Sequence, residues 1–334
     1  MAASSRGQVQ NHMMAAETKK IWMDGKLVNS EDAKVHVLSH TLHYGVGVFE
    51  GIRCYATRNG PAIFRLEDHV KRLIASARIY RMPLPYSEAE IVRAILDTQT
   101  ANDVVPSYIR PILYRGEPAL GVKNQKGRVS LAVAAIPAKK YLGEHSEAGV
   151  RAKISPYRKP HSDAIPSAAK ADGNYINSYL AGIDAAEDGY DEAILLDQNG
   201  YVAEGTGENI FLVRNGVVYT PGPESDILLG VTRASVLEIA RDLGFTVVEK
   251  LVSVSELLTA DEAFFSGTYA EIAPIREISH YLVGNGKPGR VTRDIMDVFY
   301  KLIRGEEPKY ARWLHPVAAV VKPVARPVRR PASS

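Results

Sequence analysis

The stretch "DEAILLDQNGYVAEGTGENIFLVRNGVVYT" (residues 191–220) contains four short runs rich in apolar residues. Asn199-Gly200 separates the first two runs and Asn215-Gly216 the last two, and Asn-Gly is a strong signal for the tight turn of a β-hairpin. The stretch therefore predicts two antiparallel hairpins. Because helical patterns flank it on both sides, we expect an α/β protein of the α+β kind with mixed sheets, rather than a doubly wound parallel sheet.

Strands and amphipathic helices are predicted along the rest of the chain. Apolar residues recur with helical spacing from Val70 to Ala77, and Ser87 and Glu90 have the spacing of a capping box at the start of a second helix. The predicted strands are 20–28, with a hairpin turn at Asp24-Gly25, 62–66, 107–114 and 129–136, and the predicted helices are 66–80, 86–98, 174–189, 230–244 and 291–305.

The regular patterns stop once inside the chain, in "PAKKYLGEHSEAG" (residues 137–149), which we interpret as a loop between two domains. A smaller α/β domain then covers residues 20–136, and a larger one covers residues 150–313. We expect the N-terminal extension 1–19 and the basic, Pro-rich tail 314–334 to be disordered, because neither has a regular apolar pattern that could pack.

Composition excludes several classes of protein. The chain has 334 residues, 46% hydrophobic and 24% charged, which is typical of a globular protein, and no apolar run approaches the ~20 residues that span a bilayer. The net charge of +3 comes from the tail, so we expect no nucleic-acid partner; its basic residues are Lys322, Arg326, Arg329 and Arg330. A single cysteine, Cys54, excludes an internal disulfide and a multi-cysteine metal site and fits the cytoplasm.

One lysine, Lys170, lies among small residues in "IPSAAKADGNYINSYLAG" (residues 165–182), just ahead of a predicted helix. Judged alone, it is most simply interpreted as a solvated surface lysine. The alternative is that its amine forms a covalent bond, as in lysines that form Schiff bases with carbonyl cofactors.

Two segments have the features of an anion seat. Residues 230–232, "GVT", lie where a helix begins, so free backbone N–H groups and the positive end of the helix dipole favour an anion there, although most helix starts bind nothing. Residues 266–268, "SGT", offer exposed amides and hydroxyls, or form an ordinary strand-to-loop turn. By contrast, "GVGVFEG" (residues 45–51) has the wrong glycine spacing for a dinucleotide site.

Taken together, these features suggest one cofactor. A reactive lysine, a carboxylate at Glu204 in the glycine-flanked segment "VAEGTGEN" and two anion seats are the groups that pyridoxal 5′-phosphate needs. The amine would bond to the aldehyde, the carboxylate would keep the pyridine nitrogen protonated, and the seats would hold the phosphate. Spacing alone leaves this a hypothesis.

Six segments carry a resemblance to a known family. They are, in chain order, "HVLSHTLHYGVGVFEGIRCY", "YIRPILY", "IPSAAKADGNYINSYLAG", "DQNGYVAEGTGENIF", "LLGVTRASV" and "FFSGTYAEIAPI". They resemble the signature segments of the branched-chain amino acid aminotransferases, which belong to the class IV (D-amino acid aminotransferase-like) fold group of pyridoxal phosphate enzymes. The resemblance extends from about residue 20 to residue 313. It implies a fold-type IV enzyme, with two mixed α/β domains, the cofactor in the cleft between them, and a homodimer or an assembly of dimers such as a hexamer.

The resemblance also implies roles for individual residues. Lys170 matches the lysine that bonds to the cofactor, Glu204 the partner of its ring nitrogen, and Tyr175 the tyrosine beside its phenolic oxygen. The phosphate binders are matched by Arg72, Val231, Thr232, Gly267 and Thr268. The substrate-pocket residues are matched by Tyr44, Phe49, Gly51, Arg53, Tyr108, Arg110, Tyr141 and Thr268, and Leu120 and Val122 match apolar residues that reach a neighbouring subunit's pocket.

Three positions depart from a simple pattern. The helical periodicity places Arg72 opposite the apolar stripe, in solvent, whereas the resemblance places it on the phosphate. Tyr269, which we include in the substrate pocket, stands where the family commonly has a small residue, and it would either narrow the pocket or turn away from it. Leu229 stands where proline is common.

The expected reaction is the transamination of L-leucine, L-isoleucine and L-valine with 2-oxoglutarate, giving branched 2-oxo acids and L-glutamate. Lys170 would act as the general base, and Glu204 would stabilise the protonated ring. The alternatives within the fold are a D-amino acid aminotransferase, an aminodeoxychorismate lyase and a promiscuous amine transaminase. A non-catalytic binding protein would have no reason to keep both Lys170 and Glu204.

Overall fold

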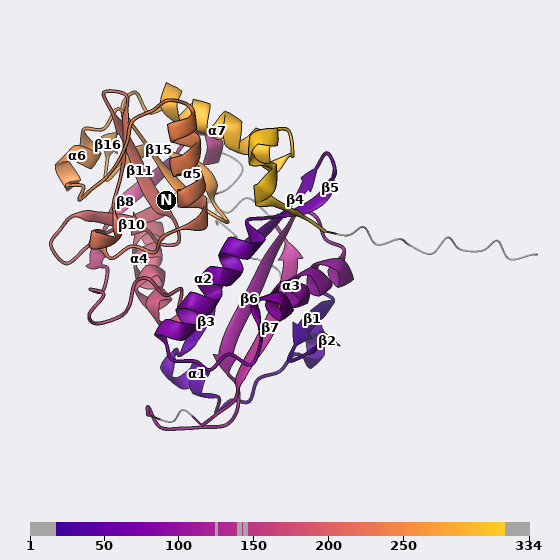
Figure 1. The fold of residues 1–334 in the computed structure, drawn as a ribbon. Coiled ribbons are helices and arrows are strands. Elements are labelled where there is room, and N and C mark those ends of the chain that lie inside the picture. Colours follow the sequence, from indigo (N-terminus) through magenta and orange to yellow (C-terminus); the bar gives the residue numbers. More distant parts are fainter. Residues whose placement is uncertain (1–17, 124–125, 139–141, 143–145, 318–334) are drawn as a thin grey trace, which may run out of the picture.

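The computed structural model describes residues 18–123, 126–138, 142 and 146–317. Two β-sheets with helices packed against them form the framework of the molecule (Figure 1). The first half of the chain builds one lobe and most of the second half builds the other. Tyr141, one of the predicted pocket residues, lies outside the described residues.

The first sheet is antiparallel, with the strand order β17-β5-β4-β6-β7-β1-β2 and with β3 paired to β6. Its strands are β1 (Lys20–Met23), β2 (Lys26–Asn29), β3 (Gly47–Phe49), β4 (Ile52–Thr57), β5 (Gly60–Phe64), β6 (Ser107–Arg115), β7 (Val129–Pro137) and β17 (Leu314–Pro316). The helices of this half are α1 (His40–Tyr44), α2 (Leu66–Ile79) and α3 (Glu88–Asn102). The predicted capping box of Ser87 and Glu90 is present at the start of α3. The apolar faces of α2 and α3 share one buried core with the sheet.

The second sheet is mixed, with the strand order β10-β9-β8-β15-β14-β11-β12-β13 and with β16 paired to β15. Its strands are β8 (Val150–Arg158), β9 (Glu192–Leu196), β10 (Val202–Gly205), β11 (Asn209–Arg214), β12 (Val217–Thr220), β13 (Val247–Glu249), β14 (Glu262–Gly267), β15 (Glu271–Ile278) and β16 (Tyr281–Leu282). The helices of this half are α4 (Tyr175–Glu187), α5 (Val231–Asp242), α6 (Val254–Leu258) and α7 (Arg290–Ile303). β8 runs parallel to both of its neighbours, β9 and β15.

The two hairpins predicted from residues 191–220 are confirmed. β9 and β10 pair antiparallel, as do β11 and β12. Asn215 and Gly216 both have positive φ, of 51° and 76°, as the tight turn between twisted strands requires. The hairpins add antiparallel strands to a sheet that also contains parallel pairs, so the predicted α/β class with mixed sheets is confirmed.

The structure corrects the predicted limits of both disordered termini. Residues 314–316, assigned to the tail, form β17, which pairs with β5 at the edge of the first sheet, where Pro316 removes no needed hydrogen bond. Thr18, assigned to the N-terminal extension, is buried and donates its hydroxyl to the Ala135 carbonyl at 3.0 Å. Contacts with strands far away in the sequence hold Thr18 and residues 314–316 in place. The local sequence pattern does not reveal such contacts.

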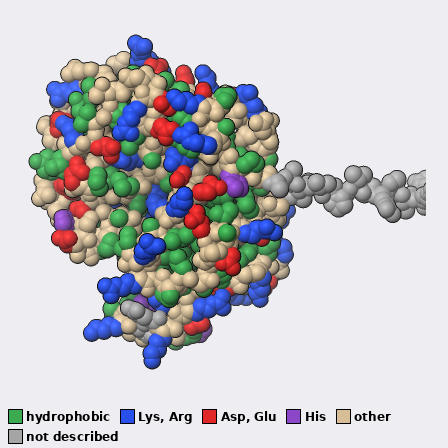
Figure 2. Space-filling model, in the orientation of Figure 1, with side chains coloured by type: hydrophobic (Ala, Val, Ile, Leu, Met, Phe, Trp, Pro, Cys, Tyr) green, Lys and Arg blue, Asp and Glu red, His purple; other side chains and the backbone are tan. Residues whose placement is uncertain are grey.

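The surface shows no strong separation of charge on the face in Figure 2, where basic and acidic side chains are interspersed with exposed hydrophobic ones. Within the part of the chain that the structure describes, no helix has the length and apolar character needed to cross a membrane.

Candidate active site

One pocket brings together most of the predicted residues. It lies where α2 and β6 of the first half meet the segment before α4, the turn after β10, the start of α5 and the end of β14. The predicted residues that line it are Gly51, Arg72, Tyr108, Lys170, Tyr175, Glu204, Val231, Thr232, Gly267, Thr268 and Tyr269.

Lys170 is held in this pocket by the segment between β8 and α4. Its carbonyl accepts a hydrogen bond from the backbone N–H of Phe49, and its N–H donates to the Ser76 hydroxyl, both at 3.0 Å. Its Nζ donates to the Tyr175 hydroxyl at 2.5 Å. Burial, with the nearby charge of Arg72, lowers the pKa of Lys170 to about 8. The solvated-surface interpretation is therefore wrong, and the amine can become neutral and nucleophilic close to neutral pH.

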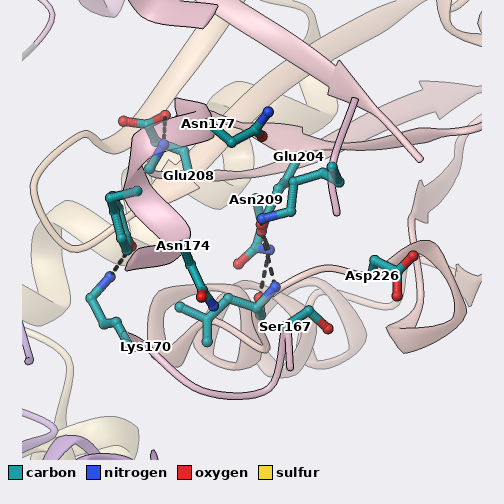
Figure 3. A network of polar contacts seen from close by, with 12 residues as sticks. Ser167, Lys170, Asn174, Asn177, Glu204, Glu208, Asn209 and Asp226 are labelled. Atoms are coloured by element: carbon teal, nitrogen blue, oxygen red, sulfur yellow. Dashed lines mark hydrogen bonds and ion pairs between the residues drawn. The ribbon is translucent and has the colours of Figure 1, made fainter. Parts of the chain in front are cut away.

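Glu204 lies apart from Lys170 in the same pocket, on β10 (Figure 3). Its Oε1 lies 2.7 Å from the Lys159 ammonium, and its Oε2 accepts hydrogen bonds from the Asn209 amide at 3.1 Å and the Leu228 N–H at 3.2 Å. Burial alone would lower the pKa of Lys159, but the Glu204 carboxylate outweighs it and raises that pKa. A buried carboxylate with a cation and two N–H donors is well suited to hold a proton on a basic ring nitrogen.

Arg72 faces the pocket, not the solvent that helical periodicity predicted. Its Nε and Nη2 lie 2.6 and 2.9 Å from the two oxygens of Glu50, which also contacts His69 Nδ1 at 2.7 Å. Burial alone would raise the pKa of Glu50, but the charges of Arg72 and His69 outweigh it and hold that pKa well below its usual range. The third guanidinium nitrogen donates to the Leu229 carbonyl at 3.0 Å, just before α5. This ion-pair group fixes Arg72 beside the start of α5.

The start of α5 and the end of β14, the two segments predicted as anion seats, both line the pocket. α5 begins at Val231, and the N–H groups of a first helical turn have no partners within the helix. A Cβ on the preceding Gly230 would lie 2.2 Å from Asn209 Oδ1, so the close approach requires glycine. The buried Ser266 hydroxyl has no hydrogen-bond partner among the described residues. These free donors fit the phosphate of pyridoxal 5′-phosphate, just as Lys170 and Glu204 fit its aldehyde and ring nitrogen.

Two tyrosines form one wall of the pocket. The rings of Tyr108 and Tyr269 meet edge to face, with their centres 4.9 Å apart. A Cβ on Gly51 would lie 1.9 Å from the Tyr108 hydroxyl, so this ring lies directly over Gly51. Tyr269 lines the pocket and does not turn away from it. Its ring, packed against that of Tyr108, therefore narrows the pocket.

Phe49 and Arg110 lie next to this wall. The Phe49 ring centre is 4.9 Å from that of Tyr175, and Arg110 Cζ lies 4.5 Å from the Phe49 ring centre. Arg110 Nη2 donates to the Tyr108 hydroxyl at 3.0 Å, while its buried Nε has no hydrogen-bond partner among the described residues.

Six of the predicted substrate residues that the structure describes lie outside the lining of this pocket: Phe49 and Arg110, next to the wall of tyrosines, and Tyr44, Arg53, Leu120 and Val122. Arg53 lies behind Tyr269, with Cζ 5.9 Å from its ring centre, and pairs with Glu271. The Tyr44 hydroxyl accepts a hydrogen bond from the Gly121 N–H at 3.0 Å, so Tyr44 lies beside the exposed Leu120 and Val122 and not beside Lys170. Tyr44, Leu120 and Val122 thus form a separate group within one chain.

Sequence reasoning missed four residues of the site: Glu50, His69, Lys159 and Asn209. Glu50 had a local signal, because it is a lone acid that follows the apolar run "GVGVF" (residues 45–49). Lys159 had none, since its partner Glu204 lies far along the chain and only the folded sheet brings the two together.

The class of protein follows from a comparison with known families. Residues 47–278 match the family model "Amino-transferase class IV". This match covers more than half of the chain, so the chain belongs to the class IV aminotransferases.

The relatives narrow that class. The branched-chain-amino-acid aminotransferase of Salmonella typhimurium is 45% identical over 305 residues, which are 90% of this chain and 99% of the relative. The crystal structure of the Escherichia coli branched-chain amino acid aminotransferase superposes with a TM-score of 0.88 at 43% identity, covering 90% of this chain and all of that one. The branched-chain amino acid aminotransferase from Thermobaculum terrenum, in its PLP-form (holo-form), has a TM-score of 0.84 at 37% identity, covering 90% and 99% of the two chains. Within its class, the chain belongs with the branched-chain-amino-acid aminotransferases.

Proposed function

We propose that the pocket around Lys170 and Glu204 performs the transamination of L-leucine, L-isoleucine and L-valine with 2-oxoglutarate, with pyridoxal 5′-phosphate as cofactor. The family supports the reaction and the cofactor. The observation that carries the assignment to this pocket is the joint placement of an amine with a lowered pKa, an ion-paired carboxylate and a free helix start.

Each residue of the pocket has a separate role in the proposed reaction. When bound, pyridoxal phosphate supplies an electron sink and carries the amino group from donor to acceptor. Lys170 accepts the proton from the donor's Cα, because its amine is neutral in a large fraction of molecules near pH 8. Glu204, held by Lys159 and Asn209, keeps a proton on the ring nitrogen. Tyr175 accepts a hydrogen bond from Lys170 and so orients its amine.

Two kinds of substrate must use the same pocket. Phe49, Tyr108 and Tyr269 offer apolar rings to a branched side chain. 2-Oxoglutarate brings a second carboxylate, which needs a partner when it leaves water. Arg110 is next to these rings and has a buried Nε without a partner among the described residues, so we assign it to that carboxylate.

Pairing of two chains would complete the pocket. Val37, Leu42, Leu120 and Val122 are exposed apolar residues of the N-terminal half, and Ile176 and Tyr179 expose apolar area on α4. Such surfaces favour contact with another protein surface. We propose a homodimer, or an assembly of dimers such as a hexamer, in which Tyr44, Leu120 and Val122 reach the partner's pocket. Sedimentation at micromolar concentration would contradict this proposal if it found only monomers.

We also propose that the protein works in the cytoplasm. Its single cysteine, Cys54, is buried and free, which suits a reducing compartment.

A panel of amino donors with 2-oxoglutarate tests the proposed function. L-Leucine, L-isoleucine and L-valine should give glutamate at the highest rates, and D-leucine and a simple primary amine should be much slower. Preferred turnover of D-leucine or of the amine would assign the pocket to one of the rival activities. Pyruvate release from aminodeoxychorismate would identify the lyase.

A further inference from the structure

One buried carboxyl group lines the pocket and a second one is hydrogen-bonded to it, and the mechanism above uses neither. Glu192 on β9 and Glu208 in the turn after β10 are each 4% exposed, and their side chains are hydrogen-bonded to each other. Two carboxyl groups can share a hydrogen bond only if one of them carries a proton, because an ionised carboxylate has no donor. The pair therefore contains a buried proton.

The donors around the pair show which residue carries the proton. The Glu192 carboxylate accepts from the Ala193 N–H at 2.7 Å and also from Thr206. Glu208 Oε2 accepts from the Gly207 N–H at 3.1 Å. Burial and the negative charge of Glu192 raise the pKa of Glu208 well above its usual range. Burial raises the pKa of both groups, but Glu192 has more hydrogen-bond donors that stabilise its ionised form, so Glu208 is the acid that donates to it.

The position of Glu208 connects this proton to the anion seat. Glu208 lines the pocket (Figure 3), and a Cβ on Gly267 would lie 3.1 Å from its Cγ. Among the titratable groups around Glu208, Glu192 on β9 has the largest effect on its pKa and Glu204 on β10, which is paired with Lys159, has a smaller one. On β14, Gly267 has no charge. An ionised Glu208 would place an uncompensated negative charge behind the seat for the phosphate.

We propose that Glu208 is a positioning residue that must remain a neutral carboxylic acid, donating its proton to Glu192, for the pocket to hold the cofactor's phosphate. This inference rests on the proposed function, because it assumes that residues 231–232 and 266–268 bind that phosphate. The inference says that Glu208, next to the phosphate-binding residues, is protonated. The proposed reaction does not require this.

Two amide variants with the same change in size test the proposal. In Glu208→Gln the amide donates to Glu192 as the acid does, so the seat stays uncharged. Glu192→Gln removes the negative charge that raises the pKa of Glu208, and its new amide N–H₂ favours the ionised form of Glu208, so Glu208 should ionise at a lower pH in this variant. The readout is the ratio of the dissociation constants of pyridoxal and pyridoxal 5′-phosphate for the cofactor-free protein, which isolates the contribution of the phosphate.

The ratio of the pyridoxal to the pyridoxal 5′-phosphate dissociation constant should agree within about twofold between the wild type and Glu208→Gln. In Glu192→Gln this ratio should be about 10- to 100-fold smaller, because one negative charge near the phosphate weakens phosphate binding by about that factor. Equal losses in both variants, or no loss in Glu192→Gln, would overturn the proposal. Failure of the proposed function gives a different result, in which the wild type binds neither compound at Lys170.

The pH profile of the same ratio provides a test that does not depend on the folding of Glu192→Gln. In the wild type the ratio should fall as alkaline pH removes the proton from Glu208, whereas in Glu208→Gln it should stay level over the same range. Titration of Lys170 and of the phosphate changes both proteins alike and cancels in the comparison. Parallel profiles for the two proteins would contradict the proposal.

Discussion

Glu204 and Glu208 lie four residues apart, on β10 and in the turn after it, and both side chains are buried. Glu204 pairs with the Lys159 ammonium at 2.7 Å and accepts from Asn209. Glu208 instead shares a hydrogen bond with another carboxyl group, that of Glu192. One short segment thus contains an ion-paired carboxylate, Glu204, and a protonated carboxylic acid, Glu208, in the turn that follows the strand.

The difference shows that partners, not burial, decide the charge of a buried acid. A negative charge is useful opposite a ring nitrogen that must stay protonated, and harmful behind a seat for phosphate. Glu50 supports this interpretation on the other side of the pocket, where Arg72 and His69 hold its pKa well below the usual range despite complete burial.

The contrast between the two glutamates is relevant to catalysis only if this pocket is the active site, and Lys170→Ala tests that condition. The variant removes both the amine that bonds to the cofactor and the base, so we expect turnover of L-leucine to fall by about 10⁴-fold or more. Lys71→Ala, which removes an exposed lysine of α2 outside the pocket, should keep normal activity. Near-normal turnover in Lys170→Ala would place the chemistry elsewhere.

Arg110→Leu extends the contrast to a third carboxylate, that of the substrate. The half-reaction with glutamate should lose about 1.5–3 kcal/mol, the range for a hydrogen bond to a charged group, and the half-reaction with leucine clearly less. Single-turnover spectroscopy of the cofactor separates the two halves. Equal losses would mean that Arg110 only supports the fold, and Arg110→Lys should recover part of the glutamate half alone.

Tyr269→Ala tests the apolar side of the same pocket. Removing the ring that narrows the wall should raise kcat/KM for a bulky donor such as L-phenylalanine relative to L-leucine by about tenfold, which is within the 1–3 kcal/mol that small changes of pocket size produce. Tyr281→Ala, which removes an exposed tyrosine outside the pocket, is the control. An unchanged ratio would show that Tyr269 does not limit the donor.

A smaller effect is the pH at which Lys170 becomes reactive. Burial and the charge of Arg72 lower its pKa to about 8, so its neutral fraction rises with pH and saturates well below the ~10.4 of an ordinary lysine. The rate at which pyridoxal phosphate bonds to the cofactor-free protein should therefore rise with pH and level off just above pH 8. The background rate measured with Lys170→Ala is subtracted. A rate that keeps rising to about pH 10 would show that the amine is not perturbed.

Much of the fold could be predicted because its signals are local. The Asn-Gly turns and the capping box of Ser87 each depend on a few neighbouring residues. β17 could not be predicted, since it is a strand only because β5 offers an edge far back in the chain. Lys170 and Glu204 were found through motifs.

Their partners could not be found in this way. Lys159 reaches Glu204 only because β8 and β9 lie together in the folded sheet, and the charge of Glu208 depends on Glu192, which precedes it by a whole hairpin. The periodicity of α2 placed Arg72 in solvent because it could not include Glu50 on another element. Charge states are properties of the assembled site.

The most direct test of the contrast is the turnover of L-leucine by Glu204→Gln and Glu208→Gln, measured side by side with saturating pyridoxal phosphate. Both changes replace a buried carboxyl group by an amide of the same shape. We predict a loss of about 10²- to 10³-fold for Glu204→Gln, because a neutral amide cannot hold the ring proton, and less than about threefold for Glu208→Gln. Similar losses in the two variants would contradict the account.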